Sequence, residues 1–141
     1  PTLLPEALES GTLPVSSIVG LGEGVRFVGE LGAANIGEHE RQLREALVEK
    51  TEGLPGLIIY EPTPDSGIYL FNFEGMCCEQ TAAYLEKEDI AVRAGLHCAP
   101  SAHEVLGTLP DGAVRISFGI FNDCEQVERT ASALWKISKR V

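Results

Sequence analysis

An arginine, a glycine, a histidine and a cysteine stand within six positions of one another, at Arg93, Gly95, His97 and Cys98. The thiolate is the nucleophilic form of cysteine, and an ordinary thiol, with a pKa of about 8.5, is mostly protonated at neutral pH. Because nearby positive charge favours ionisation, Arg93 and His97 are candidates to activate Cys98. Gly95 and Pro100 mark the segment as a loop. We interpret Cys98 as a nucleophile presented on that loop.

The alternative for Cys98 is a small buried hydrophobic residue, which is what a single cysteine usually is. Its polar, glycine- and proline-flanked setting favours the reactive interpretation. The other cysteines are Cys77, Cys78 and Cys124, and no CxxC pair occurs. We expect free thiols, as in a cytosolic protein.

A zinc site is a further interpretation of the same region, because histidine and cysteine are the ligands that zinc prefers. The candidates are His97, Cys98 and His103, with Cys77 and Cys78 upstream. Their spacing fits no usual zinc pattern, so we predict no metal site.

Arg115 lies in a predicted strand, 113–118, in which Val114, Ile116 and Phe118 alternate with polar residues. This alternation predicts one buried face, with Arg115 on the other face. A guanidinium can hold a carboxylate, such as that of an amino acid, through two parallel hydrogen bonds. A surface salt bridge is the other interpretation of this arginine.

Periodic apolar residues predict the helices that position these groups. Ile18, Leu21, Val25 and Val28 form one helical seam, and a second helix is expected over residues 36–51 after Asn35. A third helix carries Cys77, Thr81, Tyr84 and Leu85 on one face and ends in the charged stretch 86–89. In a fourth, begun by Asn122 and Asp123 with Gln126 following, the apolar stripe is Val127, Ala131, Leu134 and Ile137.

Short apolar runs predict the strands. Residues 56–60 and 68–73 are separated by the turn-rich segment 61–67, which indicates two adjacent antiparallel strands. A further short strand is expected over residues 90–93, before the loop that carries Cys98. Helices and strands alternate, so the fold class is α/β or α+β.

Composition excludes several classes of partner. The chain has 141 residues, of which 44% are hydrophobic, and this suffices for one globular domain with a core. Its formal net charge of −10 argues against nucleic acid and anionic membranes, which need clustered lysine and arginine. With no apolar run of 18 residues and no signal peptide, we expect a soluble, cytoplasmic protein.

The segments 90–100 (IAVRAGLHCAP) and 114–122 (VRISFGIFN) together resemble the C-terminal domain of cysteine desulfurases of the NifS/SufS kind, in the class V aminotransferase family. Residues 9–12, 18–21 and 38–40 resemble the passage from the large into the small domain of that family. The resemblance implies the α+β small domain of a fold type I pyridoxal-phosphate enzyme, with a small, mostly antiparallel sheet and helices packed on one face. Residues 1–35 are then the connecting segment and interdomain helix, and residues 36–141 the small domain.

The resemblance also implies roles. In that family the matching cysteine attacks the sulfur of L-cysteine bound to pyridoxal phosphate, leaving a persulfide and releasing alanine, so Cys98 inherits this role. Arg115 binds the substrate carboxylate with Arg93 near the same pocket, and Thr12 contacts the cofactor phosphate of the neighbouring subunit in a homodimer. Gly95, His97 and Asn122 support the loop. An acceptor protein, as in iron–sulfur cluster assembly, takes the sulfur.

One departure limits what this chain does alone. The family's cofactor-binding lysine follows a histidine, and the chain has no His-Lys pair; it also begins at Pro1 rather than at methionine. We therefore expect an inactive part of a longer enzyme whose large domain holds the cofactor. The alternatives are another class V enzyme, such as a selenocysteine lyase or an aminotransferase-like relative, and a non-enzymatic binding module.

Overall fold

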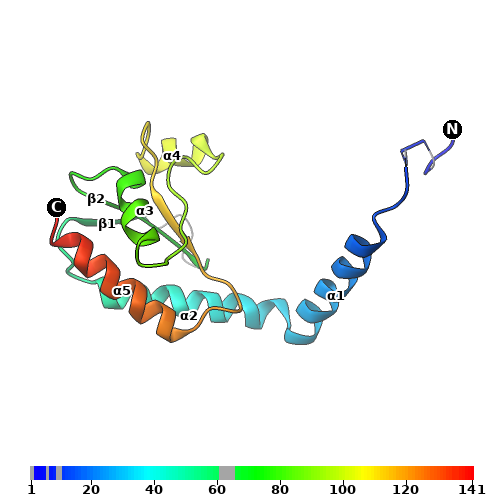
Figure 1. Cartoon of the computed structure of the whole chain (residues 1–141), viewed down its shortest axis with the longest axis horizontal. Helices are drawn as coiled ribbons and strands as arrows, with labels where there is room; N and C mark the ends of the chain where they lie inside the picture. The colour runs from blue at the N-terminus through cyan, green and yellow to red at the C-terminus, as the bar shows by residue number, and fades with distance from the viewer. Residues whose placement is uncertain (1, 6, 9–10, 61–65) are drawn as a thin grey trace. The chain divides into compact units, whose positions relative to one another are not determined.

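The computed structural model describes residues 2–5, 7–8, 11–60 and 66–141, which form two compact units, Pro1–Asn35 and Ile36–Val141 (Figure 1). The first unit contains α1 (Val15–Leu31), which confirms the helix predicted from the apolar seam. The turn residues 61–65 and the pair 9–10 named above lie outside the described residues. No helix in the described part of the chain is long and apolar enough to cross a membrane.

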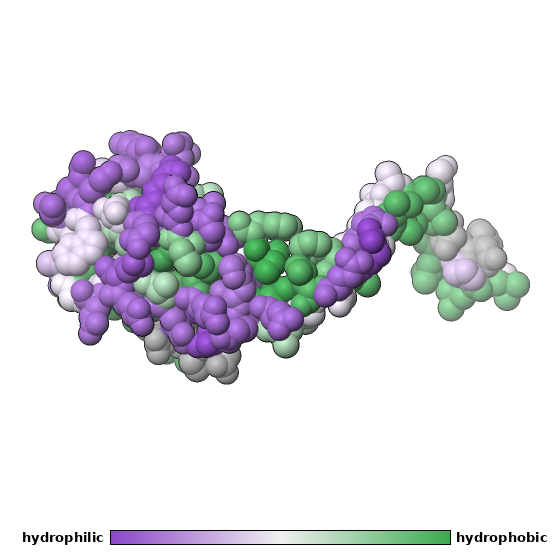
Figure 2. All heavy atoms as spheres, turned by 90° about the horizontal axis from the view of Figure 1, so that it is seen from below, coloured by the Kyte–Doolittle hydropathy of each residue, from purple (hydrophilic) through white to green (hydrophobic). Residues whose placement is uncertain are grey.

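Helix α1 buries none of its residues. Ile18 and Leu21 are 51% and 69% exposed, and Val25 is 65% exposed, although all three are apolar. The surface of the first unit is accordingly rich in apolar atoms, whereas the visible face of the second unit is mostly hydrophilic (Figure 2). Glycine in the helix also lowers its intrinsic stability by roughly 1 kcal/mol per residue relative to alanine.

The second unit is built on an antiparallel sheet in the order β1-β2-β3, with β1 (Leu57–Tyr60), β2 (Ile68–Phe73) and β3 (Val114–Ser117). The two antiparallel strands expected upstream are thus confirmed. In β3 the burial alternates, with Val114 and Ile116 buried and Arg115 half-buried, so the predicted two-faced strand is confirmed as well.

The strand expected over residues 90–93 is wrong. Only Arg93 forms a bridge, which it makes with Arg115, and the backbone of Gly95 pairs with Ala113. The amide of Ile90 is not available for a strand because it donates to the Leu85 carbonyl at the end of α3 (Cys78–Glu86), at 3.0 Å. The segment therefore pairs with the edge of β3 at two points and then turns away.

Three helices cover the sheet: α2 (Ala33–Thr51), α3 and α5 (Cys124–Ser138). Tyr69 and Phe71 of β2 are fully buried, and so are Leu47 of α2 and Leu134 of α5. These side chains belong to one core cluster, which confirms an α+β domain with a small antiparallel sheet. At roughly 1.5–3 kcal/mol for each large apolar side chain, this burial is the main stabilising term.

The apolar face of α3 differs from the prediction by one residue. Cys78, Thr81 and Leu85 are its buried residues, whereas Cys77 is exposed and occupies the N-cap position. Cys78 also donates its thiol hydrogen to the Asp111 carbonyl, with Sγ 3.2 Å from the oxygen. The buried thiol next to the N-cap thus joins α3 to the chain ahead of β3.

The start of α5 confirms the predicted cap. The Asp123 carboxylate accepts a hydrogen bond from the Gln126 amide at 2.9 Å, and the Gln126 side chain accepts one from the Asp123 amide at 3.4 Å. This reciprocal capping box satisfies amides that have no partner inside the helix.

A short helix, α4 (Pro100–Leu106), was not predicted. It has seven residues, too few for an apolar stripe to repeat, and Val105 is 88% exposed. Its sequence signals are instead Pro100 in the first turn and Gly107 at the C-cap, in the left-handed conformation that glycine adopts readily.

Candidate functional site

The loop that carries Cys98 is fastened to the chain before β3. Gly95 and Ala113 exchange two backbone hydrogen bonds, of 3.1 and 3.2 Å. A Cβ placed on Gly112 would stand 2.3 Å from the carbonyl carbon of Gly95, closer than any real contact. Gly112 is therefore required for this approach, and with it for the position of the loop at Gly95.

Cys98 is exposed on this loop. His97 and Cys98 have φ angles of 52° and 59°, in the left-handed region that residues with a side chain rarely adopt. Within the described part of the chain, Cys98 Sγ makes no hydrogen bond, so the thiol is open to solvent. Cys78 is different, because burial raises the pKa of its thiol. All four cysteines are free, as expected.

The ring of His97 is held by two partners. Nε2 lies 3.2 Å from the Arg93 carbonyl, and Nδ1 lies 3.3 Å from Nε2 of His103. Burial, and then the positive charges of Arg115 and Arg93, lower the pKa of His97. Both ring nitrogens are thus engaged away from Cys98, so this arrangement supports a role for His97 in holding the loop.

His103 is a site residue that sequence reasoning considered only as a zinc ligand. It is 2% exposed, and its Nδ1 lies 2.6 Å from the hydroxyl of Thr108, which is also buried. The bounds of α4 at Pro100 and Gly107 were the only sequence signal for this placement, since a lone histidine in a polar stretch carries no periodicity.

The structure brings Arg93 and Arg115 together, as the family resemblance implies. Their backbones are paired, and both line a small pocket of about 220 Å³ with Ala91, Val92 and Ser117. Neither guanidinium forms an ion pair with a carboxylate in the described residues, and Nε of Arg115 is buried without a hydrogen-bond partner there. In a chain with 21 acidic residues, two neighbouring unpaired arginines form a positive site suited to an anion.

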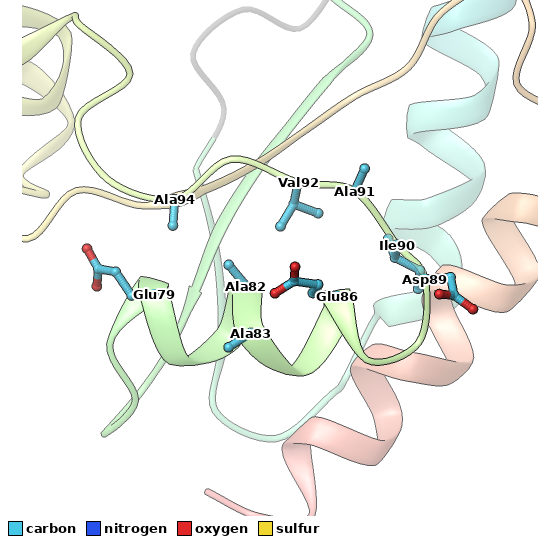
Figure 3. A pocket seen from close by; sticks show the side chains of 9 residues that line it. All are labelled: Glu79, Ala82, Ala83, Glu86, Asp89, Ile90, Ala91, Val92 and Ala94. Carbon is cyan, nitrogen blue, oxygen red and sulfur yellow. The ribbon is translucent and has the colours of Figure 1, made fainter.

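A groove of about 690 Å³ lies between α3 and residues 89–94, and four alanines are among the residues that line it (Figure 3). Glu79, Glu86 and Asp89 stand along it, while Arg93, Arg115 and Cys98 do not line it. Because three carboxylates repel an anionic group, the small arginine pocket is the better candidate for a substrate carboxylate.

The remaining candidates lie elsewhere. Asn122 is a structural residue of the turn before α5: its Oδ1 accepts from the Gly119 amide at 2.8 Å, its Nδ2 donates to Gln126 at 2.7 Å, and its carbonyl accepts from His39 at 2.9 Å. It lies after β3, at the opposite end of that strand from the Cys98 loop. Thr12 is exposed and belongs to the first unit.

The lysines do not provide a Schiff-base residue at this site. Lys50 is paired with Glu128 through a short contact, and Lys136 with Glu88 at 2.7 Å. Lys87 lies over the ring of Tyr84, and Lys139 is the C-cap of α5. None of the four lines the arginine pocket, so the residues of this chain alone do not fit pyridoxal phosphate. Nor do its described residues contain a cluster of three side chains able to hold a metal ion.

Sequence comparison identifies a family and several relatives of the chain. The model of the family described as aminotransferase class-V matches residues 2–130. A probable cysteine desulfurase of Staphylococcus epidermidis is 34% identical over 133 residues, which are 93% of this chain and 32% of the relative. A cysteine desulfurase of Klebsiella pneumoniae is 31% identical over 138 residues, 96% of this chain and 33% of the relative.

Solved structures show the same relationship. The apo structure of a cysteine desulfurase from Thermococcus onnurineus NA1 superimposes with a TM-score of 0.85 at 31% identity, covering 97% of this chain and 34% of that one. For the cysteine desulfurase CsdA (S-sulfonic acid) from Escherichia coli the TM-score is 0.83 at 25% identity, with 96% and 33% covered. The chain spans about a third of the length of these relatives, the C-terminal third. It belongs to the aminotransferase class-V family.

Proposed function

We propose that this chain is the C-terminal part of a cysteine desulfurase, in which Cys98 accepts sulfur from L-cysteine and Arg115, assisted by Arg93, binds the substrate carboxylate. Similarity to cysteine desulfurases over nearly the whole chain supports the reaction. The observation that carries the residue assignment is the pocket lined by the two unpaired arginines, whose backbone pairing fastens the exposed loop of Cys98.

The arginine pocket orients the substrate. A guanidinium binds a carboxylate through charge-assisted hydrogen bonds, and an amino acid held by its carboxylate presents its side-chain sulfur in a restricted set of directions. Arg115 is half-buried on β3, so its stem moves less than that of an arginine on a surface helix. We assign Arg115 the main contact and Arg93, which is more exposed, the supporting one.

Cys98 then receives the sulfur. Its thiolate forms a sulfur–sulfur bond to the substrate sulfur while the carbon–sulfur bond breaks, and a proton replaces sulfur on carbon. The balance is one enzyme thiol plus L-cysteine giving one enzyme persulfide plus L-alanine. Pyridoxal phosphate, the cofactor of the family, would supply the electron sink for the breaking bond and would be held mainly by parts of the protein beyond this chain.

The exposure of Cys98 suits the second half of the cycle, transfer of the persulfide sulfur to an acceptor protein. Because the thiol of Cys98 makes no hydrogen bond with the described residues, it can face the substrate and then a partner. The complete protein is proposed to act as a cytoplasmic homodimer in which Thr12 contacts the cofactor phosphate of the neighbouring subunit. In this arrangement residues 1–35 are the connecting segment and residues 36–141 the small domain.

The test uses the complete protein with pyridoxal phosphate and L-cysteine, and measures sulfide and alanine. Cys98→Ala is expected to abolish both products, whereas Cys124→Ala, which removes another exposed free thiol, leaves them unchanged. Persistent alanine formation without Cys98 would show a different class V enzyme, and absence of products in the wild type would refute catalysis altogether.

Arg115→Gln is expected to lower kcat/KM for L-cysteine by about 10- to 100-fold, mainly through KM, because one charge-assisted hydrogen bond to the carboxylate is lost. Arg129→Gln is the control, since Arg129 lies on α5 and faces Asp89 at 3.5 Å. An unchanged KM for Arg115→Gln would remove this arginine from the substrate site.

A further inference from the structure

A buried histidine close to the proposed nucleophile has no part in the chemistry above. His103 is 2% exposed, and Thr108, its partner, is 6% exposed. A polar group that is buried with a hydrogen bond at each ring nitrogen is costly to place unless both bonds are kept. His103 therefore restricts the positions of the residues that it is bonded to, and one of them, His97, directly precedes Cys98.

The donors and acceptors in this chain of bonds can be assigned. The Arg93 carbonyl can only accept, so Nε2 of His97 must carry the hydrogen of the 3.2 Å bond between them. In neutral His97 the other nitrogen, Nδ1, is then an acceptor, and Nε2 of His103 must donate to it across 3.3 Å. Nδ1 of neutral His103 is left to accept the Thr108 hydroxyl hydrogen, at 2.6 Å. Hydrogen bonds run in one direction from Thr108 to Arg93.

This series of hydrogen bonds involves residues on both sides of Cys98 in the sequence. Arg93 and His97 precede it, and His103 follows it on α4, whose last turn is closed by the Thr108 amide donating to the His103 carbonyl at 2.9 Å. Opening the link between the two histidines would leave the left-handed pair at His97 and Cys98 with one side-chain hydrogen bond in place of two, the bond from His97 to the Arg93 carbonyl. Each such residue costs of the order of 1–3 kcal/mol unless its surroundings hold it.

We propose that His103 is a positioning residue: oriented by Thr108, it holds His97 in the Nε2–H tautomer against Arg93 and thereby sets the place of Cys98 on its loop. The effect on turnover rests on the proposed function of Cys98, whereas the tautomer and loop geometry do not.

Protonation of His97 breaks the same series of hydrogen bonds. Adding a proton to His97 turns its accepting Nδ1 into a donor that faces the donating Nε2 of His103. Burial and the charges of Arg115, His103 and Arg93 lower the pKa of His97, and its hydrogen bond to the Arg93 carbonyl opposes them in part. The series of hydrogen bonds from Thr108 to Arg93 is therefore expected to stay intact at neutral pH and to break when His97 is protonated in acid.

Two substitutions of His103 distinguish a role of its hydrogen bond to His97 from a role in filling the buried space. His103→Gln can place an amide donor near the position of Nε2 and keep the bond to His97. His103→Asn can place an amide oxygen near the position of Nδ1 and keep the bond to Thr108, but cannot reach His97. If only burial matters, the two amides behave alike; if the link positions the loop, glutamine rescues and asparagine does not.

The first readout is nitrogen-15 NMR of the histidine rings in this chain. The wild type and His103→Gln are expected to show His97 as the Nε2–H tautomer, and His103→Asn a mixture. Thr108→Val, which removes only the hydroxyl, is expected to release the tautomer of His103 and serves if the His103 variants do not fold. An Nδ1–H tautomer of His97 in the wild type, or wild-type spectra for His97 in His103→Asn, would overturn the proposal.

The second readout is turnover by the complete protein. Misplacement of a reacting atom by about 1 Å can lower a rate by about 100-fold, so His103→Asn is expected to lower kcat by about 10- to 100-fold with KM for L-cysteine unchanged. His103→Gln should stay within about threefold of the wild type on the same grounds. Equal kcat for both variants overturns the positioning role. If Cys98→Ala retains activity, the proposed function fails while the tautomer measurement still decides the role of His103.

Discussion

Substitution of Gly112 by alanine tests whether the close approach of two backbone segments sets the loop of Cys98. Gly112 is buried, has a φ angle of 81°, and lies where an added Cβ would meet Gly95 at 2.3 Å from its carbonyl carbon and 2.4 Å from its oxygen. Backbone atoms cannot move aside as the end of a side chain can. The loop must shift, or the two bonds between Gly95 and Ala113 must stretch.

Gly112→Ala is expected to lower the free energy of unfolding in two ways. Alanine in the left-handed region is less favourable by about 1–2 kcal/mol. Overpacking a fitted contact adds about 1–3 kcal/mol, which gives about 2–5 kcal/mol in total for Gly112→Ala. Gly107→Ala is the matched control, because Gly107 has a similar φ angle of 69° but no atom within 4 Å of the added Cβ. It should show only the conformational part, about 1–2 kcal/mol.

The assay is urea unfolding of both variants and the wild type, with the free energy of unfolding extrapolated to water. A second measurement is the alkylation rate of Cys98 in a background where Cys77 and Cys124 are serine, since a displaced loop alters access to the thiol. If Gly112→Ala is no less stable than Gly107→Ala, and Cys98 reacts as in the wild type, the inference that this contact positions the loop is refuted.

Three further outcomes are expected. Asp123→Ala removes the capping box of α5 and should lower the free energy of unfolding by about 1 kcal/mol in the same urea assay. Burial raises the pKa of Tyr69 to about 12, and tyrosine in the unfolded state ionises near 10; the free energy of unfolding should therefore fall between those two pH values, and Tyr69→Phe should remove this part of the fall. Among the thiols, mass spectrometry after brief alkylation should find Cys98 modified and Cys78 protected until the chain unfolds, because Cys78 is buried and its pKa is raised.

Elements with a long period and a clear cap could be predicted from sequence. The apolar stripe of α5 from Val127 to Ile137 is buried, and its capping box follows from Asp123 and Gln126 alone. The prediction failed where one backbone bond decided between two outcomes. Residues 90–93 have the composition of a strand, but the Ile90 amide closes α3, a contact that no local pattern reports.

The candidate site could be predicted by residue type but not by arrangement. The grouping of Arg93 with Arg115 was implied by the family resemblance, and the pocket that both line agrees with it. The direction in which His97 turns could not be predicted, because its partners are a carbonyl four residues back and a histidine on a helix too short to recognise. Thr108 could not be predicted for the same reason, because its hydroxyl acts only through its hydrogen bond to His103.

Most places where the described residues depart from ordinary folding rules lie in or next to two neighbouring segments, 93–98 and 112–115, whereas Asp89, with a φ angle of 56°, lies outside them. His97 and Cys98 are consecutive left-handed residues. Among the residues that the structure describes, the buried side-chain atoms left without a partner are Nε of Arg115 and Oδ1 of Asn72, whose amide donates to the Gly112 carbonyl at 2.9 Å. Helix α5, by contrast, follows the rules of capping and periodicity throughout. Strain and unmet hydrogen bonds persist only where the surrounding structure holds them, and they concentrate at functional sites. Because the paired backbones of Gly95 and Ala113 join the two segments, these departures fall in one region of the second unit, which is an argument for the site that is independent of any resemblance.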